Sequence, residues 1–278
     1  MNVKDLIQKH RHIFGTNYTE DVNCQLAYLM DVDENPLTDS SQNTNTGALV
    51  SAGHPNFETA APPKPYSTGY YDLDGVDDNI TVAQNASLDN IEELTILNWG
   101  KIRATGQYDR ILDKGYKIRW ECRGGNLMFS RVMDGTDVGG LDNSALEVNT
   151  WYHIVIKYSH AGDKKGYMYV DGVFRDGASQ QAGTGNITDD TGGIEIGNRG
   201  GYCWDGWMDE FAIFDRCLDL TEINDVMDNG LTGIVANPYP IDWLKKKSVS
   251  GYHCFMNAYL KAKVLSYDPL KLPDGTLW

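Results

Sequence analysis

The sequence predicts an all-β fold, a sandwich or a barrel, and two observations support this prediction. Residues 151–175 read as an antiparallel meander in the middle of a sheet. Side chains in 151–158 alternate between two faces, and Asp171-Gly172 is typical of a tight hairpin turn. The 278 residues also include 29 glycines and 16 tyrosines, which are the turn and strand residues of such folds. With 41% hydrophobic residues, the chain can form a substantial core.

The composition argues against several kinds of partner. A net charge of −15 disfavours nucleic-acid binding, because few cations would replace the counterions of a phosphate backbone. No apolar run approaches the roughly 18 residues of a membrane span, so no membrane partner is expected. The first residues lack the apolar segment of a secretory signal, so we expect synthesis in the cytoplasm. Five cysteines without C-x-x-C spacing predict reduced thiols.

The chain before the meander predicts an arm followed by short strands. Residues 1–23 read as an N-terminal arm that contains a short amphipathic helix. Residues 25–31 and 48–50 read as strands on either side of a polar loop. Residues 70–82 read as a strand, a tight acidic turn and a second strand.

After the meander, residues 211–214 form the last predicted strand, and a helix follows it. Asp219 is placed to cap a helix over 220–229, with Glu222 at the third helical position completing a capping box. Gly230 is placed to end this helix in the left-handed conformation.

Residues 239–278 read as a basic, amphipathic C-terminal arm. They hold six lysines and three aspartates, and some of their apolar residues recur at helical spacing. Because the rest of the chain is acidic, we expect this arm to dock on other protein subunits. The residues expected to make that contact are Lys245, Lys246, Lys247, Met256, Tyr259, Leu260 and Trp278.

A series of short motifs, in register over residues 24–230, resembles a known family. The motifs are Leu26-Ala27-Tyr28, Asp39-Ser40-Ser41, Leu73-Asp74-Gly75-Val76-Asp77-Asp78, Leu94-Thr95-Ile96, Ile111-Leu112-Asp113-Lys114-Gly115, Trp151-Tyr152-His153, Tyr169-Val170-Asp171-Gly172, Ile194-Glu195-Ile196-Gly197 and Gly206-Trp207-Met208-Asp209-Glu210-Phe211. Together they resemble the laminin-G-like group of the concanavalin A-like lectin/glucanase superfamily, in the divergent branch common in bacterial and phage proteins. The resemblance implies a two-sheet antiparallel jelly-roll sandwich over 24–238, with short helical or extended arms at 1–23 and 239–278.

The resemblance also implies a structural calcium ion, held where the first and last strands lie side by side. The candidate ligands are Asp74, Asp77 and Asp78 in the acidic turn, together with Asp209. Carboxylate oxygens on short loops suit calcium. In the alternative interpretation, Asp74-Gly75 only makes a turn, and the other carboxylates are solvated or paired with lysines.

Aromatic residues next to polar side chains predict a carbohydrate-binding site. The candidate residues are Tyr202, Trp204, Trp207, Arg199 and Asp205. In the alternative interpretation, Trp207 belongs to the core and residues 202–204 form a loop packed on its own sheet.

We expect no enzymatic activity. Hydrolases of the resembling superfamily carry an E-x-D-x-x-E strand, which this sequence lacks. Asp209 and Glu210 are the remaining carboxylate pair, and adjacent residues on a regular strand point to opposite faces.

Two functional hypotheses remain, with a glycoside hydrolase as a distant third. In the first, the protein is a non-enzymatic structural or adhesion component of a larger assembly, such as a phage capsid decoration or tail. Its arms would dock it there, on the virion or another surface facing the outside, where it could also bind surface glycans. In the second, it is a stand-alone carbohydrate-binding module. The fold accommodates many functions, so the site residues must decide between them.

Overall fold

The computed structural model describes residues 16–50, 55–105, 109–142, 145–175, 179–188 and 190–233. The chain divides into two compact units, Met1–Ile234 and Val235–Trp278, and all described residues belong to the first unit. Within the described part, no helix is both long and apolar enough to cross a membrane.

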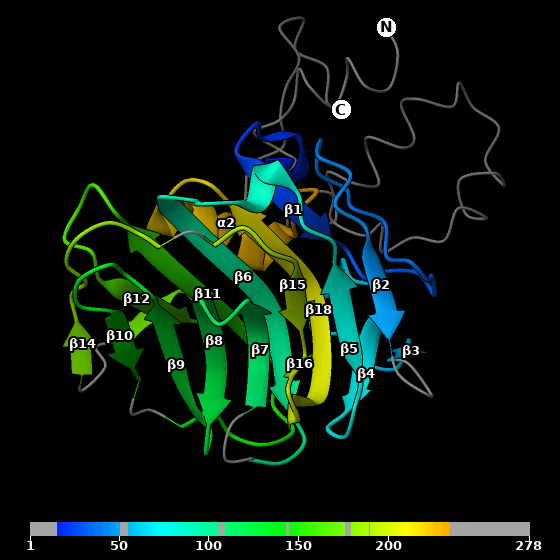
Figure 1. Cartoon of the computed structure of the whole chain (residues 1–278). Coiled ribbons are helices and arrows are strands. Elements are labelled where there is room, and N and C mark those ends of the chain that lie inside the picture. Colours follow the sequence, from blue (N-terminus) through cyan, green and yellow to red (C-terminus); the bar gives the residue numbers. More distant parts are fainter. Residues whose placement is uncertain are drawn as a thin grey trace, which may run out of the picture. The chain divides into compact units, whose positions relative to one another are not determined.

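The described residues form two eight-stranded sheets, and every pairing described within these sheets is antiparallel. Sheet A has the order β13(Val173–Arg175), β12(Gly166–Val170), β11(Tyr152–Ser159), β6(Glu93–Ile102), β18(Asp205–Phe214), β4(Tyr70–Asp74) and β3(Asn56–Glu58), with β1(Cys24–Tyr28) also paired to β18. Sheet B has the order β14(Ser179–Gln181), β10(Val138–Leu141), β9(Asn126–Arg131), β8(Ile118–Arg123), β7(Asp109–Lys114), β15(Ile194–Ile196), β5(Asn79–Val82) and β2(Gly47–Val50). The two sheets face each other in Figure 1, which confirms the predicted all-β sandwich.

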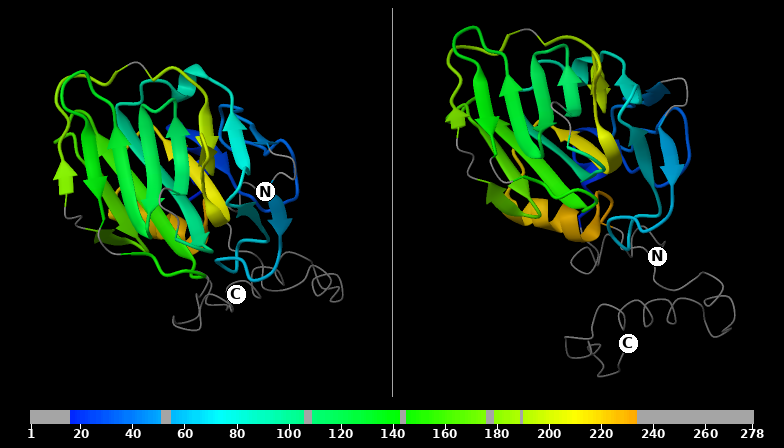
Figure 2. Two further views of the ribbon diagram at one scale, coloured as in Figure 1. Left: turned by 60° about the horizontal axis from the view of Figure 1, so that its bottom comes forward. Right: turned by 90° about the horizontal axis from the view of Figure 1, so that it is seen from below.

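Four shorter elements complete the described part of the chain. They are the 3-10 helices η1(Tyr18–Glu20) and η2(Ala86–Leu88), the small hairpin β16(Asn198–Arg199)–β17(Tyr202–Cys203) and the helix α2(Leu220–Asn229). Figure 2 (right) shows the resulting three layers, with α2 on the far side of sheet A from sheet B.

Strand β11 shows why sheet A lies between sheet B and the helix α2. Its residues Ile154 and Ile156 belong to the core between the two sheets, whereas Val155 belongs to a second apolar cluster with residues of α2. Successive side chains of a strand point to opposite faces, so a run that is apolar on both faces is buried on both. The meander β11–β12–β13 was expected in the middle of a sheet. It instead ends sheet A, because β13 has only β12 as a neighbour.

The helix α2 begins and ends near the predicted residues. The Asp219 carboxylate accepts a hydrogen bond from the Glu222 N–H, and the Glu222 carboxylate accepts one from the Asp219 N–H, so the predicted capping box is present. At the other end Gly230 has a φ of 76° and a ψ of 169°. The positive φ agrees with the prediction, but the ψ lies outside the left-handed helical region.

The first and last strands of the body are neighbours, since β1 pairs with β18. From residue 16 onward the N-terminal segment already belongs to the body. Tyr18 is buried, its N–H donates to the Leu231 carbonyl at 2.7 Å, and its hydroxyl donates to Asp225 at 3.1 Å. The remainder of the predicted arm, residues 1–15, lies outside the described residues.

Candidate carbohydrate-binding face and acidic turn

The five residues predicted to bind sugar do not lie in one place. Trp204 is fully buried and belongs to the core between the sheets. A ring in that position cannot stack on a ligand from solvent, so the prediction for Trp204 is wrong. The alternative of a loop packed against its own sheet is closer, because Cys203 is buried as well.

Trp207 and Asp205 belong to the outer face of sheet A, beyond the part that α2 covers. Trp207 is half-buried, and its ring has the Lys101 ammonium and the Arg103 guanidinium each 4.4 Å from its centre. Asp205 forms an ion pair with Arg103 at 2.5 Å. Two cations lie against this half-buried indole, so it has less free ring surface for a sugar than an exposed ring with a single cation.

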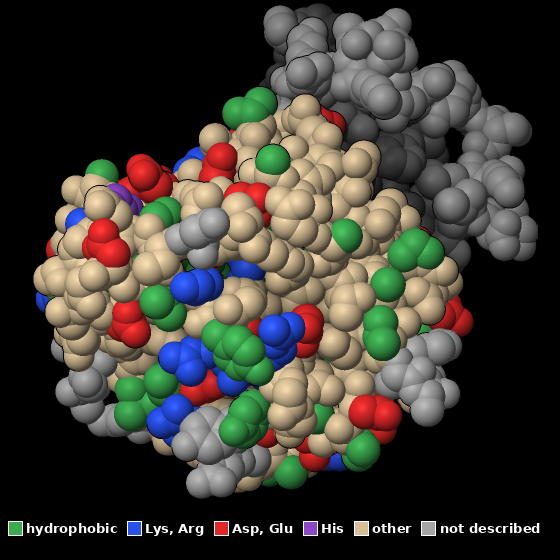
Figure 3. Space-filling view, viewed as in Figure 1, with side chains coloured by type: hydrophobic (Ala, Val, Ile, Leu, Met, Phe, Trp, Pro, Cys, Tyr) green, Lys and Arg blue, Asp and Glu red, His purple; other side chains and the backbone are tan. Residues whose placement is uncertain are grey.

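Tyr202 and Arg199 lie on the hairpin β16–β17, which packs on β7 in sheet B, and they face each other across the hairpin. Tyr202 is 44% exposed, and the Arg110 guanidinium lies 5.6 Å from the centre of its ring. A second aromatic side chain, Tyr116, is 50% exposed in the turn after β7, with the Arg199 guanidinium 4.8 Å from its ring. Figure 3 looks onto this outer face of sheet B, where apolar and basic side chains gather.

Sequence reasoning did not identify Tyr116 or Arg110 as candidate site residues. The signal for Tyr116 was present, since an aromatic residue follows Gly115 at the tip of a tight turn between two strands. Arg110 carried no such signal, because its place beneath the hairpin depends on the fold.

Arg110 is the centre of an ion-pair network on β7 and β8. Its guanidinium lies 3.2 Å from Asp113 and 3.1 Å from Glu121, and all three side chains are buried. Burial raises the pKa of the Asp113 carboxyl, although Arg110, Arg199 and Arg119 act in the opposite direction. The network holds the base of the hairpin in one arrangement.

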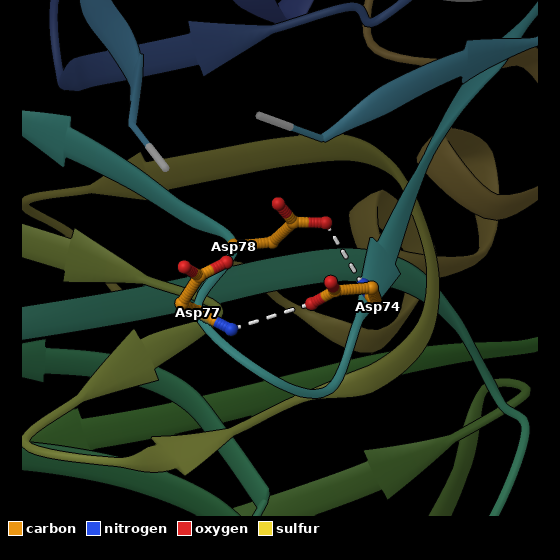
Figure 4. A group of neighbouring side chains, drawn as sticks. All are labelled: Asp74, Asp77 and Asp78. Carbon is orange, nitrogen blue, oxygen red and sulfur yellow. Dashed lines mark hydrogen bonds between the residues drawn. The ribbon is translucent and has the colours of Figure 1, made fainter. Parts of the chain in front are cut away.

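The acidic turn between β4 and β5 brings three of the four predicted calcium ligands together. Carboxylate oxygens of Asp74, Asp77 and Asp78 lie within 4.8 Å of one another. As Figure 4 shows, Asp74 accepts the Asp77 N–H and Asp78 accepts the Asp74 N–H, at 3.3 Å and 2.9 Å. Each of these carboxylates has a second oxygen. The donor set is hard and anionic, so it fits calcium, which would need further oxygen ligands from water or backbone.

Asp209, the fourth predicted ligand, is not part of this turn. Asp205 is the β18 residue that lies opposite Asp74. Asp209 lies farther along β18, where its carboxylate accepts the Ser67 hydroxyl at 2.5 Å. The prediction that Asp209 joins the other three ligands is therefore wrong.

Asp209 and Glu210 form a buried carboxyl pair. Asp209 is 0% exposed and Glu210 is 4% exposed. The register between β18 and β6 shifts between Asp209 and Ala212, and Glu210 has a φ of 48°. This β-bulge places both carboxyl groups on the outer side of sheet A. There, burial raises the pKa of the Tyr66 hydroxyl, and both carboxyl groups raise it further. The expectation of opposite faces assumed a regular strand and is wrong.

Burial governs the chemistry of this pair. It raises the pKa of Glu210 from 4.5 to about 8, and it raises the pKa of Asp209 well above its ordinary value, with the charge of Glu210 adding to the effect. The Leu231 N–H donates to Glu210 at 3.0 Å, and the Glu210 N–H donates to Asp209 at 2.9 Å. A saccharide has no access to carboxyl groups packed in this way.

The residues predicted to dock on a partner, Lys245, Lys246, Lys247, Met256, Tyr259, Leu260 and Trp278, lie outside the described residues. Docking on other subunits of an assembly, and the virion location that depends on it, stay predictions. Among the cysteines, Cys24, Cys122, Cys203 and Cys217 are unpaired, as predicted.

Residues 74–224 match the family described as the concanavalin A-like lectin/glucanases superfamily. The chain belongs to this superfamily. A comparison with curated proteins found no match.

Several solved structures share the superfamily sandwich. Domain 4 of AbnA, an extracellular GH43 arabinanase from Geobacillus stearothermophilus solved with arabinotriose, is 15% identical with a TM-score of 0.58; the match covers 73% of this chain and 98% of that one. The binding domain of Paraclostridial Mosquitocidal Protein 1 is 16% identical with a TM-score of 0.57, covering 73% and 51%. The botulinum neurotoxin serotype D ligand-binding domain, solved with N-acetylneuraminic acid, is 18% identical with a TM-score of 0.56, covering 73% and 50%. The chain thus spans about half the length of these toxin domains. At these identities the likeness establishes a shared fold.

Proposed function

We propose that this protein is a non-catalytic carbohydrate-binding module whose site is the outer face of sheet B around the hairpin β16–β17. The observation that carries the proposal is the pair of exposed rings, Tyr116 and Tyr202, each in contact with a guanidinium group. Exposed aromatic rings beside fixed hydrogen-bond donors are the combination that a sugar ring requires, because one face of a pyranose is apolar and its rim is polar.

Further facts support the proposal. Domain 4 of AbnA, whose length is 98% covered by the match, was solved in complex with arabinotriose. The serotype D neurotoxin domain, half of which matches this chain, was solved in complex with N-acetylneuraminic acid. The carboxyl pair that a hydrolase would need, Asp209 and Glu210, is buried on the other sheet, away from Tyr202. A binding function therefore agrees better with the geometry than a hydrolytic one.

The test is binding of the protein to a panel of plant, bacterial and animal glycans, with Tyr202→Ala as the site variant. Loss of one stacking ring is expected to weaken binding about tenfold. Phe174→Ala is the matched control, since Phe174 is an aromatic side chain 41% exposed on sheet A. Equal binding by the wild type and Tyr202→Ala would reject this site, and absence of binding to every glycan would reject the function.

We also propose that the acidic turn binds a calcium ion with a structural role. The convergence of Asp74, Asp77 and Asp78 favours it. The ion would hold the β4–β5 turn through carboxylate oxygens, and it would take no part in sugar binding on sheet B.

A further inference from the structure

Basic side chains are concentrated on the outer face of sheet B and on the hairpin that covers part of it (Figure 3). The arginines are Arg110 on β7, Arg119 and Arg123 on β8, and Arg199 on β16; the carboxylates among them are Asp113, Glu121 and Glu195. Four guanidinium groups thus share three carboxylates. Four aspartates also lie close enough to the hairpin to act on Cys203, namely Asp74, Asp77, Asp78 and Asp109. The excess of positive charge is therefore local to β8, where Arg119 and Arg123 lie on either side of Glu121.

Three of these arginines have carboxylate partners. Arg110 lies between Asp113 and Glu121, Arg123 lies 2.9 Å from Glu121, and Arg199 pairs with Glu195. Their charges are largely compensated, and their role is to hold the hairpin and the two strands together.

Arg119 is different. It lies opposite Asp113 in the pairing of β7 with β8, but within the described residues it forms no ion pair. Its Nε donates to the Ser130 hydroxyl at 3.1 Å, which fixes one edge of the guanidinium. The Nη1 and Nη2 groups of Arg119 can therefore bind a ligand. Together they form a planar fork that binds a carboxylate through two parallel hydrogen bonds.

The strands beside Arg119 leave room for such a ligand. Across the sheet from Arg119, the residue on β9 is Ser130 and the next one, on β10, is Gly139. Both are small, and Arg119 itself is only half-buried. On the other side Asp113 separates Arg119 from Glu195. A sugar chain lying over β9 and β10 can therefore reach the guanidinium without displacing a large side chain.

Each of the two exposed rings lies against a guanidinium group. Arg199 lies against Tyr116, and Arg110 lies against Tyr202. A sugar stacked on either ring would have a guanidinium close to the ring that supports it. Carboxylates already compensate the charges of these two arginines, so the rings supply stacking surface. The choice between an acidic and a neutral sugar then falls to Arg119, which has no such partner in the described part of the chain.

We infer that the ligand is an acidic saccharide and that Arg119 binds a carboxylate of its uronic-acid or sialic-acid residues. This inference rests on the proposed carbohydrate-binding function and names the chemical class of its ligand. It adds Arg119 to the site as the residue that selects an acidic sugar over a neutral one.

The experiment uses the full chain and pairs of ligands that differ only in charge. Oligogalacturonides and sialyl-oligosaccharides are each compared with their own methyl esters by isothermal titration calorimetry, at low and at high salt. The acidic form of the glycan that binds is expected to bind about tenfold tighter than its ester, because a charge-assisted pair replaces a neutral contact. This preference should shrink as salt is added.

Arg119→Gln is expected to lose the preference, so that its affinity for the acid falls to about its affinity for the ester. Lys165→Gln is the control, since it removes one positive charge from the β11–β12 turn of the other sheet. Equal affinity of the wild type for acid and ester, or a preference that survives in Arg119→Gln, would overturn the inference and leave the proposed function standing. If neutral and acidic glycans alike fail to bind, the proposed function falls, and this inference falls with it.

Discussion

The carboxyl groups of Asp209 and Glu210, adjacent on β18, lie on the same side of sheet A and are both buried. A β-bulge makes this possible, and Glu210 takes a φ of 48° to form it. The pair lies close to the end of α2, where the Leu231 N–H donates to Glu210 and the Tyr66 hydroxyl donates to the Met227 carbonyl. The protonation of this pair therefore bears on the stability of the whole body.

The first prediction concerns the pH range around neutrality. Burial raises the pKa of Glu210 from 4.5 to about 8, so its contribution is fully present below the unfolded pKa and is lost as the pH rises toward 8. The free energy of unfolding should fall between about pH 5 and about pH 8, and Glu210→Gln should reduce that fall. Urea unfolding at both pH values measures it. The control is Glu147→Gln at an exposed position, which should show the same fall in the free energy of unfolding as the wild type. If Glu210→Gln also shows the full fall, another group causes the pH dependence.

The second prediction concerns acid pH. Burial lowers the pKa of His153 from 6.5 to about 3, with Lys64 adding to the effect, and neither ring nitrogen has a hydrogen-bond partner among the described residues. The stability due to the neutral imidazole is present above pH 6.5 and is lost as the pH falls through the folded pKa. His153→Leu should therefore lose less stability than the wild type between about pH 6.5 and about pH 4.5. The half-buried His160 serves as control, and equal losses in all three proteins would contradict the prediction.

The third prediction tests the start of α2. Removing the Asp219 carboxylate leaves the Glu222 N–H without its acceptor, so Asp219→Ala should lower the free energy of unfolding by about 1 kcal/mol. Thr221 is exposed in the same turn of the helix, and Thr221→Ala should have a much smaller effect. Denaturant unfolding of the two variants compares them directly. Comparable losses would mean that general helix propensity matters here and the cap does not.

The fourth prediction separates two neighbouring aromatic residues. Trp204 is fully buried between the sheets, so Trp204→Ala should cost about 3–5 kcal/mol of stability. Tyr202 is 44% exposed, so Tyr202→Ala should change stability by about 0.5 kcal/mol or less while it weakens glycan binding. Thermal unfolding and calorimetry on the same preparations measure both quantities. A large loss of stability in Tyr202→Ala would assign that ring to the core.

The fifth prediction tests the acidic turn. Added calcium should raise the melting temperature, since an ion bound only by the folded state stabilises it, and Asp77→Asn should remove most of that increase. Asp33, exposed and outside the acidic turn, provides the control variant Asp33→Asn. The turn would be only a hydrogen-bonded loop if added calcium left the melting temperature unchanged. The same would follow if the increase persisted in Asp77→Asn.

The fold could be predicted from the sequence because its signals are local and repeated. Alternation along 151–158 indicated strand β11, and Asp219 with Glu222 indicated the start of α2. The middle position expected for the meander was wrong, because the place of a strand within a sheet depends on pairings between distant segments. Such pairings leave no local signal.

The candidate site was harder to predict for the same reason. Tyr202, Trp204 and Trp207 are close in sequence, but they lie on the hairpin, in the core and on the outer face of sheet A. Within these six residues the chain leaves the hairpin strand β17 and enters β18, and no pattern in the sequence says which aromatic ring will be covered. The sequence does not predict the bulge at Glu210 either, because a regular strand and a bulged strand can have the same residues.

The hydrogen bond from the Tyr18 N–H to the Leu231 carbonyl joins the two ends of the described body. The β1–β18 pairing lies beside it, so the chain enters and leaves this body at neighbouring points. A unit with that geometry can be spliced into a surface loop of another protein without stretching the host, and it can be circularly permuted by joining these ends and opening a turn elsewhere. The sandwich is thus suited to serve as a transplantable insert.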